Sequence, residues 1–281
     1  MRLLFALAIG LGLPTIAFAQ CASDAEVAAF VGSFLKKTPA KALGSAGTIE
    51  DAYCTQGKVV AALEDHLGPV IGYKAGLTAK PAMERFGVSE PVRGVLYRDM
   101  MLENGAKVPA KFGAIPLFEA DLILVVGSEE INKAKTPEDV LKHVSAVRPF
   151  IELPDLMFAK GEPITGATIT AMGVGARLGI LGDAIAVDDP AAMADALQSM
   201  TAMVKSANGE TLSSAPGAAV LGHPANAVTW LVSTGLVLKP GDFVSVGSIG
   251  PLHPTAKAGG GATVTYAGLP GDPELSVVFE E

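Results

Sequence analysis

The chain has 281 residues, with 29 acidic side chains against 21 lysines and arginines, and its formal net charge at pH 7 is -8. This charge, together with the lack of a Lys/Arg cluster, argues against nucleic-acid binding, which needs a basic surface. Only two cysteines occur, Cys21 and Cys54, too few for a thiolate metal centre. They could instead form a disulfide in an oxidising compartment, but the sequence does not show whether they meet.

The first residues have the layout of a secretory signal peptide. Arg2 gives a positive start, residues 3–18 form an apolar run, and residues 17–19 read Ala-Phe-Ala, a small-x-small cleavage site. The run is short for a retained membrane anchor. We therefore predict a signal peptide at 1–19 and a periplasmic or secreted mature protein without a membrane segment.

Two helices are predicted next, at 22–37 and 48–66. Apolar residues recur there at helical spacing, and Ser23 and Thr48 are cap candidates. We interpret residues 20–68 as a small N-terminal helical lobe.

From residue 69 onward, short strands alternate irregularly with scattered helices. Without regular βαβ alternation, the pattern predicts an α+β domain with a curled or barrel-like mixed sheet, covering 69–281. The predicted helices of this domain lie at 80–86, 136–147, 190–197 and 224–234. The predicted strands lie at 70–77, 94–102, 115–126, 151–153, 167–181, 200–207, 242–249, 262–266 and 275–279.

The strand at 115–126 carries two carboxylates inside an apolar sequence. Glu119 and Asp121 are two residues apart, so they point to the same face of a strand. Buried acids that repel each other need a cation or a shared proton. Glu152 lies in another apolar segment, and three carboxylates suit Mg²⁺ or Mn²⁺. The spacing alone also fits an exposed edge strand, but the apolar flanks favour a metal site.

Other polar residues leave two interpretations open. Lys74 lies in a strand-like segment, where its ammonium could extend to water or lie near a metal and bind an anion or move a proton. Gly247 and Ser248 could bring the backbone close to a ligand or only form a tight turn. His223 precedes a helix, and we interpret it as a capping or structural residue.

Five segments in order resemble one enzyme family. They read GYKAGLT at 72–78, FEADLILVV at 118–126, IELPD at 151–155, LGHPANAVTWL at 221–231 and VGSIGP at 246–251. Together they resemble the 2-keto-4-pentenoate hydratase and 4-oxalocrotonate decarboxylase family, within the fumarylacetoacetase-like superfamily. The resemblance runs from about residue 25 to the C-terminus.

The resemblance implies a mixed β-roll or barrel of the fumarylacetoacetase C-terminal type, with an N-terminal helical lobe. It also implies a magnesium- or manganese-dependent lyase that hydrates a 2-hydroxy-2,4-dienoate, a small 2-oxo acid type of substrate, to a 4-hydroxy-2-oxo acid. Carried over residue by residue, the implied site consists of the metal ligands Glu119, Asp121 and Glu152, the catalytic Lys74, and the substrate-binding Gly247 and Ser248.

Departures from the family leave the reaction open. Asp121 stands where relatives usually have Glu, and Val92 stands where many have Asp. If that Asp assists catalysis in the relatives, Asp99 is a candidate substitute, or the activity is changed or lost. The alternatives are a 2-oxo acid decarboxylase of the same family and a non-catalytic, exported 2-oxo acid binding protein. The family generally serves cytoplasmic aromatic catabolism, which makes export unusual. Members of the family usually form oligomers, and this tendency, with the apolar content of the chain, favours a homo-oligomer.

Overall fold

The computed structural model describes residues 21–44 and 47–281. The predicted signal peptide at 1–19 therefore lies outside the described residues. The helices are α1 (Asp24–Lys36), α2 (Ile49–Leu67), α3 (Lys80–Phe86), α4 (Pro137–Leu141), α5 (Gly166–Ala171), α6 (Pro190–Ser199) and α7 (Asn226–Ser233). None of the helices in these ranges has both the length and the hydropathy to cross a bilayer.

The described residues form strands in two sheets. The larger sheet has the order β2-β1-β11-β5-β6-β7-β3, with β12 paired to β5 and β8 to β6. Its strands are β1 (Val70–Gly76), β2 (Val92–Tyr97), β3 (Met101–Glu103), β5 (Leu117–Val126), β6 (Val144–Leu153), β7 (Leu178–Leu181), β8 (Ile185–Ala186), β11 (Phe243–Ser245) and β12 (His253–Pro254). The smaller sheet has the order β10-β9-β13-β14-β4, from β4 (Lys107–Pro109), β9 (Thr201–Ser206), β10 (Thr211–Pro216), β13 (Gly261–Ala267) and β14 (Glu274–Glu280).

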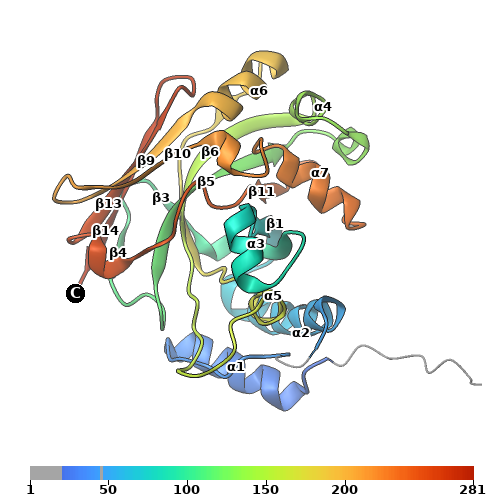
Figure 1. The fold of residues 1–281 in the computed structure, drawn as a ribbon, viewed down its shortest axis with the longest axis vertical. Helices are drawn as coiled ribbons and strands as arrows, with labels where there is room; N and C mark the ends of the chain where they lie inside the picture. The colour runs from blue at the N-terminus through green and yellow to red at the C-terminus, as the bar shows by residue number, and fades with distance from the viewer. Residues whose placement is uncertain (1–20, 45–46) are drawn as a thin grey trace, which may run out of the picture.

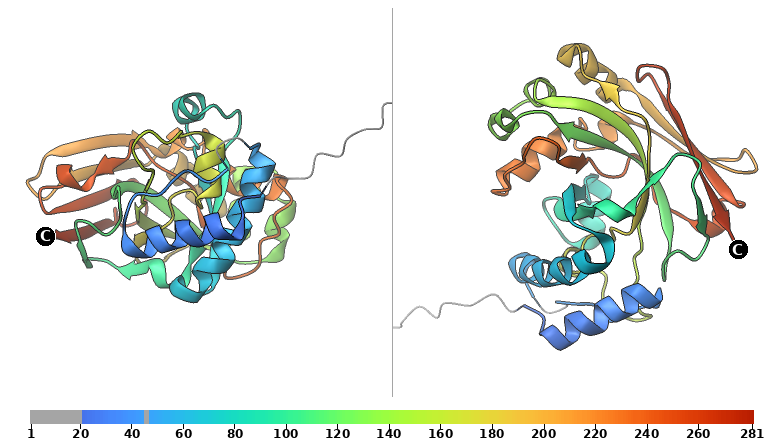
Figure 2. Two further views of the ribbon diagram at one scale, coloured as in Figure 1. Left: turned by 90° about the horizontal axis from the view of Figure 1, so that it is seen from below. Right: turned by 180° about the vertical axis from the view of Figure 1, so that it is seen from behind.

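The long strands β5 and β6 form the centre of the molecule. Figure 1 shows the smaller sheet on one side of this pair, and helices α1, α2, α3, α5 and α7 toward the other side. The larger sheet curls around the helical side, as the right-hand view of Figure 2 shows. The predicted α+β class, with a curled mixed sheet and N-terminal helices, is confirmed.

Two apolar clusters hold these layers together. The first fills the space between the sheets and includes Leu122, Val204, Val264 and Val277. The second joins the N-terminal helices to the larger sheet and includes Phe34, Val59, Leu96 and Phe150. Burial of such side chains stabilises the fold by roughly 25 cal/mol per Å² of apolar surface removed from water. The helices at 20–68 thus share a core with the sheet, and the boundary at residue 69 stays a prediction.

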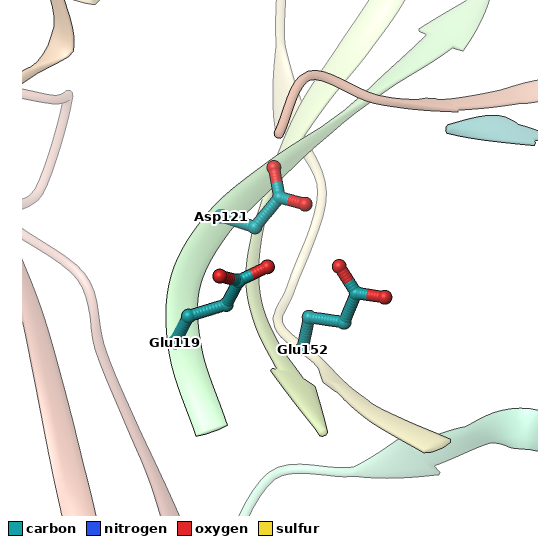
Figure 3. A group of neighbouring side chains, drawn as sticks. All are labelled: Glu119, Asp121 and Glu152. Carbon is teal, nitrogen blue, oxygen red and sulfur yellow. The ribbon is translucent and has the colours of Figure 1, made fainter. Parts of the chain in front are cut away.

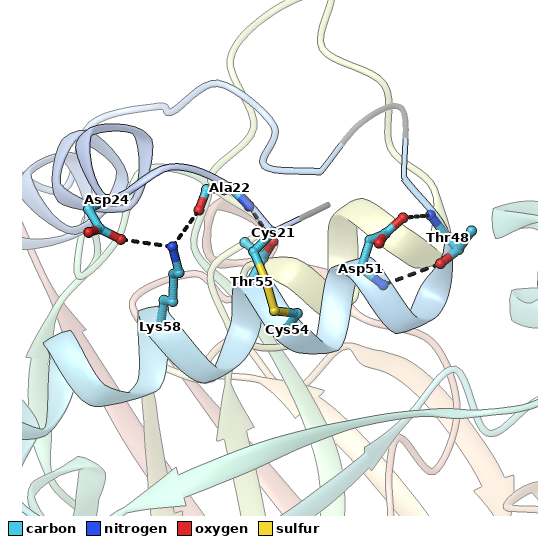
Figure 4. The surroundings of a disulfide bond; sticks show 8 residues. All are labelled: Cys21, Ala22, Asp24, Thr48, Asp51, Cys54, Thr55 and Lys58. Carbon is cyan, nitrogen blue, oxygen red and sulfur yellow. Dashed lines mark hydrogen bonds and ion pairs between the residues drawn. A yellow bond between two sulfur atoms is a disulfide. The ribbon is translucent and has the colours of Figure 1, made fainter. Parts of the chain in front are cut away.

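The start of α1 is fastened to α2 at several points. A disulfide joins Cys21 to Cys54, with the two Cα atoms 5.4 Å apart, so the two cysteines do meet. Beside it, the Ala22 N–H donates to Thr55 Oγ1 (2.9 Å), and Lys58 Nζ donates to the Ala22 carbonyl (3.0 Å) and to Asp24 (2.8 Å). Figure 4 shows these contacts along one face of α2.

Two predicted elements are wrong. The helix expected at 136–147 ends at Leu141, and the residues from Val144 onward belong to β6, which is longer than the strand expected at 151–153. Residues 167–181 were expected to form a buried strand, yet they contain most of α5, then a turn, then β7. The Thr165 side chain accepts from the Thr168 N–H (3.2 Å) and caps the helix, and Gly173 ends it with φ +84°. The apolar composition that suggested a strand reflects the burial of this helix instead.

Candidate metal and substrate site

The three predicted carboxylates come together on the paired strands β5 and β6. Glu119 and Asp121 project from the same face of β5, and Glu152 lies directly opposite Glu119 in the antiparallel register. One oxygen from each carboxylate lies within 4.8 Å of the others, and Figure 3 shows the three groups converging. All three side chains are buried. The strand pairing therefore builds the cluster that the sequence predicted.

Asp121 is held in place by three protein donors. The N–H groups of Leu122 and Gly247 donate to its Oδ1 (2.6 and 3.0 Å), and Ser245 Oγ donates to its Oδ2 (2.5 Å). These bonds fix the orientation of the shorter side chain. Burial, with a smaller effect from Glu152, nevertheless raises the pKa of Asp121 to about 7.

The two glutamates each have an oxygen without a partner. Glu119 Oε2 and Glu152 Oε2 are buried and have no hydrogen-bond partner among the described residues. Burial, and then the negative charge of Glu152, raise the pKa of Glu119 well above its ordinary value. Unsatisfied buried oxygens beside a third carboxylate are the donor set that a hard divalent cation takes. The three carboxylates could therefore hold Mg²⁺ or Mn²⁺.

Lys74 reaches the same cluster from a different part of the sheet. Its ammonium forms a buried ion pair with Glu152 Oε1 and donates to the Val174 carbonyl (3.1 Å). Lys74 lies on β1, and β11 and β5 separate β1 from β6. In a flat sheet those strands would lie roughly 14 Å apart, at about 4.8 Å per strand. The curl of the sheet brings Lys74 to Glu152.

A cavity of about 660 Å³ opens onto this cluster. Lys74, Glu119 and Glu152 line it, and Arg85 of α3 also lies in its wall. Most of the other lining groups are apolar, including Leu77, Phe86, Leu117, Pro154, Leu156, Ile169 and Leu252. The site is thus a mainly apolar pocket with acids and an ammonium at one place, the arrangement of a small-molecule site.

The three other predicted site residues differ in where they lie relative to the cavity. Ser248 lines the cavity, although its hydroxyl donates to the Gly250 carbonyl (2.6 Å). Gly247 does not line the cavity, and its N–H holds Asp121 instead. Asp99 lies at the surface, where Arg98 Nε donates to it at 2.7 Å and lowers its pKa. The structure therefore does not bring Asp99 to the cavity.

Sequence reasoning did not single out three residues of the site. Ser245 orients Asp121, the Val174 carbonyl accepts from Lys74, and Arg85 lines the cavity. Ser245 did carry a signal, because a hydroxyl in the buried strand β11 needs a partner. Arg85 and Val174 carried none, since their positions depend on how α3 and the turn after α5 pack.

Comparison with known proteins assigns the chain to a family. The model of the fumarylacetoacetate hydrolase C-terminal family matches residues 75–271, which is more than half of the chain. The chain belongs to this family. The resemblance noted from the five segments is thereby confirmed, and so is its hydratase branch, because curated members of that branch are about 30% identical to the chain.

Two curated relatives are hydratases. The 2-hydroxyhexa-2,4-dienoate hydratase of Comamonas testosteroni is 32% identical over 215 residues, covering 74% of this chain and 79% of the relative. The 2-keto-4-pentenoate hydratase of Paraburkholderia xenovorans (strain LB400) is 30% identical over 209 residues, covering 73% of this chain and 75% of the relative.

Solved structures support the fold. The 4-oxalocrotonate decarboxylase of Pseudomonas putida G7, crystallised with magnesium and adipate, has a TM-score of 0.77 at 23% identity and covers 91% of this chain and 96% of its own. The fumarylpyruvate hydrolase of Pseudomonas aeruginosa, crystallised with Mn²⁺ and pyruvate, has a TM-score of 0.53 at 18% identity, covering 74% and 89%. Both of these structures contain a divalent cation.

The predicted periplasmic or secreted location is wrong. The relatives are hydratases of a kind that serves cytoplasmic aromatic catabolism, and no comparison supports an exported protein.

Proposed function

We propose that this protein is a metal-dependent hydro-lyase that adds water to a 2-hydroxy-2,4-dienoate and releases a 4-hydroxy-2-oxo acid. The observation that carries the proposal is the buried cluster of three carboxylates with Lys74, set in an apolar cavity. The two hydratases named above, at 30% and 32% identity, support the same reaction.

Glu119, Asp121 and Glu152 are the proposed ligands. A divalent cation bound there would polarise the 2-oxo and carboxylate oxygens of the substrate and offset the negative charge that develops on them. The chain's own contribution is to keep the three carboxylates in position, with Asp121 fixed by Ser245 Oγ and two backbone N–H groups.

Lys74 is the proposed proton-moving group. An ammonium has three N–H donors, and two of them have protein acceptors here, Glu152 and Val174. The third remains for a group in the cavity, where Lys74 can move a proton during ketonisation of the dienol. Water then adds to the conjugated double bond. The apolar walls accommodate the hydrocarbon part of the dienoate and exclude bulk water.

The activity test uses 2-hydroxypenta-2,4-dienoate and the purified protein with Mg²⁺ or Mn²⁺. We expect the ultraviolet absorption of the dienoate to disappear, and Glu119→Ala to abolish this turnover. Exposed Glu103→Ala, on β3, is the control variant and should keep full activity. Unchanged turnover by Glu119→Ala would contradict the assignment.

A decarboxylase of the same family is the second candidate, and Arg85 favours it. This guanidinium lines the cavity, and its Cζ lies 5.2 Å from the centroid of the Phe86 ring. It has no carboxylate partner among the described residues. It could pair with the second carboxylate of a dicarboxylic 2-oxo acid. Release of CO₂ from 4-oxalocrotonate, with a higher KM in Arg85→Gln, would favour this reaction over hydration.

The homo-oligomer stays a prediction. Exposed apolar side chains such as Val237, which is 65% exposed, and Ile164, at 46%, are available for contacts between copies. The molar mass from light scattering will decide whether the protein is a monomer.

A further inference from the structure

Val174, in the turn after α5, has a backbone conformation that its residue type rarely adopts. Its φ is +57°, between Gly173 at +84° and Gly175 at +70°, and its side chain is β-branched. The helix end does not require this. The Gly173 N–H donates to Thr170 and the Val174 N–H to Ile169, an arrangement that needs a left-handed residue only at Gly173. An outlier of this kind in a cavity wall points to a functional constraint.

The unusual conformation directs the Val174 carbonyl at Lys74. The distance from Lys74 Nζ to the Val174 oxygen is 3.1 Å, and both residues line the cavity. The other protein acceptor of Lys74 is Glu152, which is also a proposed metal ligand. Because Val174 is not a proposed ligand, its contact with Lys74 does not depend on what Glu152 binds.

Two glycines of the sheet leave room for this turn. A Cβ at Gly76 would lie 2.3 Å from Val174 Cγ1, with its next neighbour at 3.6 Å. Gly94 lies opposite Lys74 in the β1–β2 register, and a Cβ there would lie 2.9 Å from the Gly173 oxygen and 3.1 Å from Lys74 Cγ. The turn is therefore packed directly against the strands on the Lys74 side.

We propose that Val174 is a positioning residue for the lyase reaction. Its left-handed turn, packed on Gly76 and Gly94, holds the Lys74 ammonium through the Val174 carbonyl and keeps the remaining donor directed at the substrate. The inference rests on the proposed function for the role of Lys74. The contact itself is independent of which 2-oxo acid is the substrate.

The first variant displaces the turn through a single contact. Gly76→Ala places a methyl group against Val174 Cγ1, so we expect kcat for the dienoate to fall about 10- to 100-fold, as misplacement of a reacting group by about 1 Å does. KM should stay within about threefold, and Mn²⁺ affinity by calorimetry within about twofold, because the carboxylates do not move. Gly57→Ala, on the exposed face of α2 with open space around its Cβ, is the control and should match the wild type.

The second variant tests whether the loss of kcat in Gly76→Ala comes from the contact with Val174 Cγ1. Gly76→Ala combined with Val174→Gly removes Cγ1 but keeps the carbonyl, and glycine adopts a positive φ without strain. We expect its kcat to recover to within about threefold of Val174→Gly alone.

Two results would overturn the inference: a normal kcat in Gly76→Ala, or no recovery in the double variant. If the wild type does not hydrate the dienoate, the proposed function fails. Crystal structures then decide the inference, because Lys74 Nζ must leave the Val174 oxygen in Gly76→Ala and return to it in the double variant.

Discussion

Two buried carboxylates, Glu152 and Asp155, lie three residues apart at the end of β6, and their surroundings differ. Asp155 pairs with one cation, Arg177, at 3.1 Å, and also accepts from the N–H groups of Ala114 and Ile115. Arg177 Nε and Nη2 donate to the carbonyls of Phe112 and Phe34. Every charge there has an opposite charge and every oxygen a donor.

Around Glu152 the charges do not balance. Three carboxylates face one ammonium, Lys74, and two carboxylate oxygens have no partner in the described part of the chain. Buried charge is tolerated where it is paired and hydrogen-bonded, and it is costly elsewhere. The difference separates a pair that fixes the architecture from a cluster that is complete only with a ligand.

The largest expected effect comes from breaking the balanced pair. Arg177→Met should lower the free energy of unfolding by about 3–5 kcal/mol, because Asp155 is left buried without its cation. Urea denaturation measures this change. Mn²⁺ affinity of the folded variant should stay within about threefold of the wild type. The double variant Asp155→Asn with Arg177→Met should regain part of the stability, and a larger loss there would contradict the comparison.

The unbalanced cluster should respond in the opposite way. Glu119→Gln removes one proposed ligand, and Mn²⁺ affinity should fall at least about 100-fold, judging from the 10- to 100-fold losses seen when even outer-shell partners are removed. Metal-free stability should not fall, because burial and Glu152 already disfavour the charged form of Glu119. Calorimetric titration and thermal unfolding measure the two quantities. A large loss of metal-free stability would show that Glu119, like Asp155, stabilises the fold without a ligand.

A smaller effect on Mn²⁺ affinity is expected from removing a hydrogen bond that orients one of the carboxylates. Ser245→Ala removes the hydroxyl that donates to Asp121 Oδ2, and Mn²⁺ affinity should fall about 10-fold. Ser248→Ala is the matched control, since its hydroxyl bonds only the Gly250 carbonyl and lies on the cavity wall. It should leave Mn²⁺ affinity unchanged. Equal losses in both variants would show that the loss does not come from the bond between Ser245 and Asp121.

The smallest effect concerns a buried group that stays neutral. His223 Nδ1 accepts from the Ala225 N–H (3.0 Å), its Nε2 contacts the Ala194 carbonyl (2.9 Å), and burial lowers its pKa. The unfolded chain therefore binds the proton first, and stability should decrease as pH falls below about 6.5, by at most about 1.4 kcal/mol per pH unit. Denaturation of the wild type and His223→Asn across pH 5–8 measures the difference. Parallel curves would exclude His223 as the cause.

The sequence predicted the parts of the site that depend on local periodicity. The alternation along β5 places Glu119 and Asp121 on one face, and the helical spacing of apolar residues predicted α1 and α2 closely. The pairing of Glu119 with Glu152 follows from strand register, which the sequence does not specify over that distance. Glu152 was proposed as the third ligand because it is a carboxylate in another apolar segment, and the family resemblance pointed to the same residue.

The expectations that failed did so for different physical reasons. Asp99 was chosen for its residue type, but a local bond to Arg98 satisfies it at the surface. Gly247 was expected at the substrate, but its positive φ turns its N–H toward Asp121. Residues 167–181 were expected to be a buried strand because the segment is apolar and rich in glycine, but the Thr165 cap begins a helix there. Local contacts decided the first and third cases, and a contact with the distant strand β5 decided the case of Gly247.

The fastening of α1 has a consequence for hydrogen exchange. The residues just before its first turn are joined to α2 by the Cys21–Cys54 bond, and the Phe34 carbonyl in its last turn accepts from Arg177. A helix at the edge of a domain usually opens in small, low-energy fluctuations that expose its amides. Here such an opening must also remove one of the three protein acceptors of the buried Arg177 guanidinium. The amides of α1 should therefore exchange together with those of the central strands, as one cooperative unit.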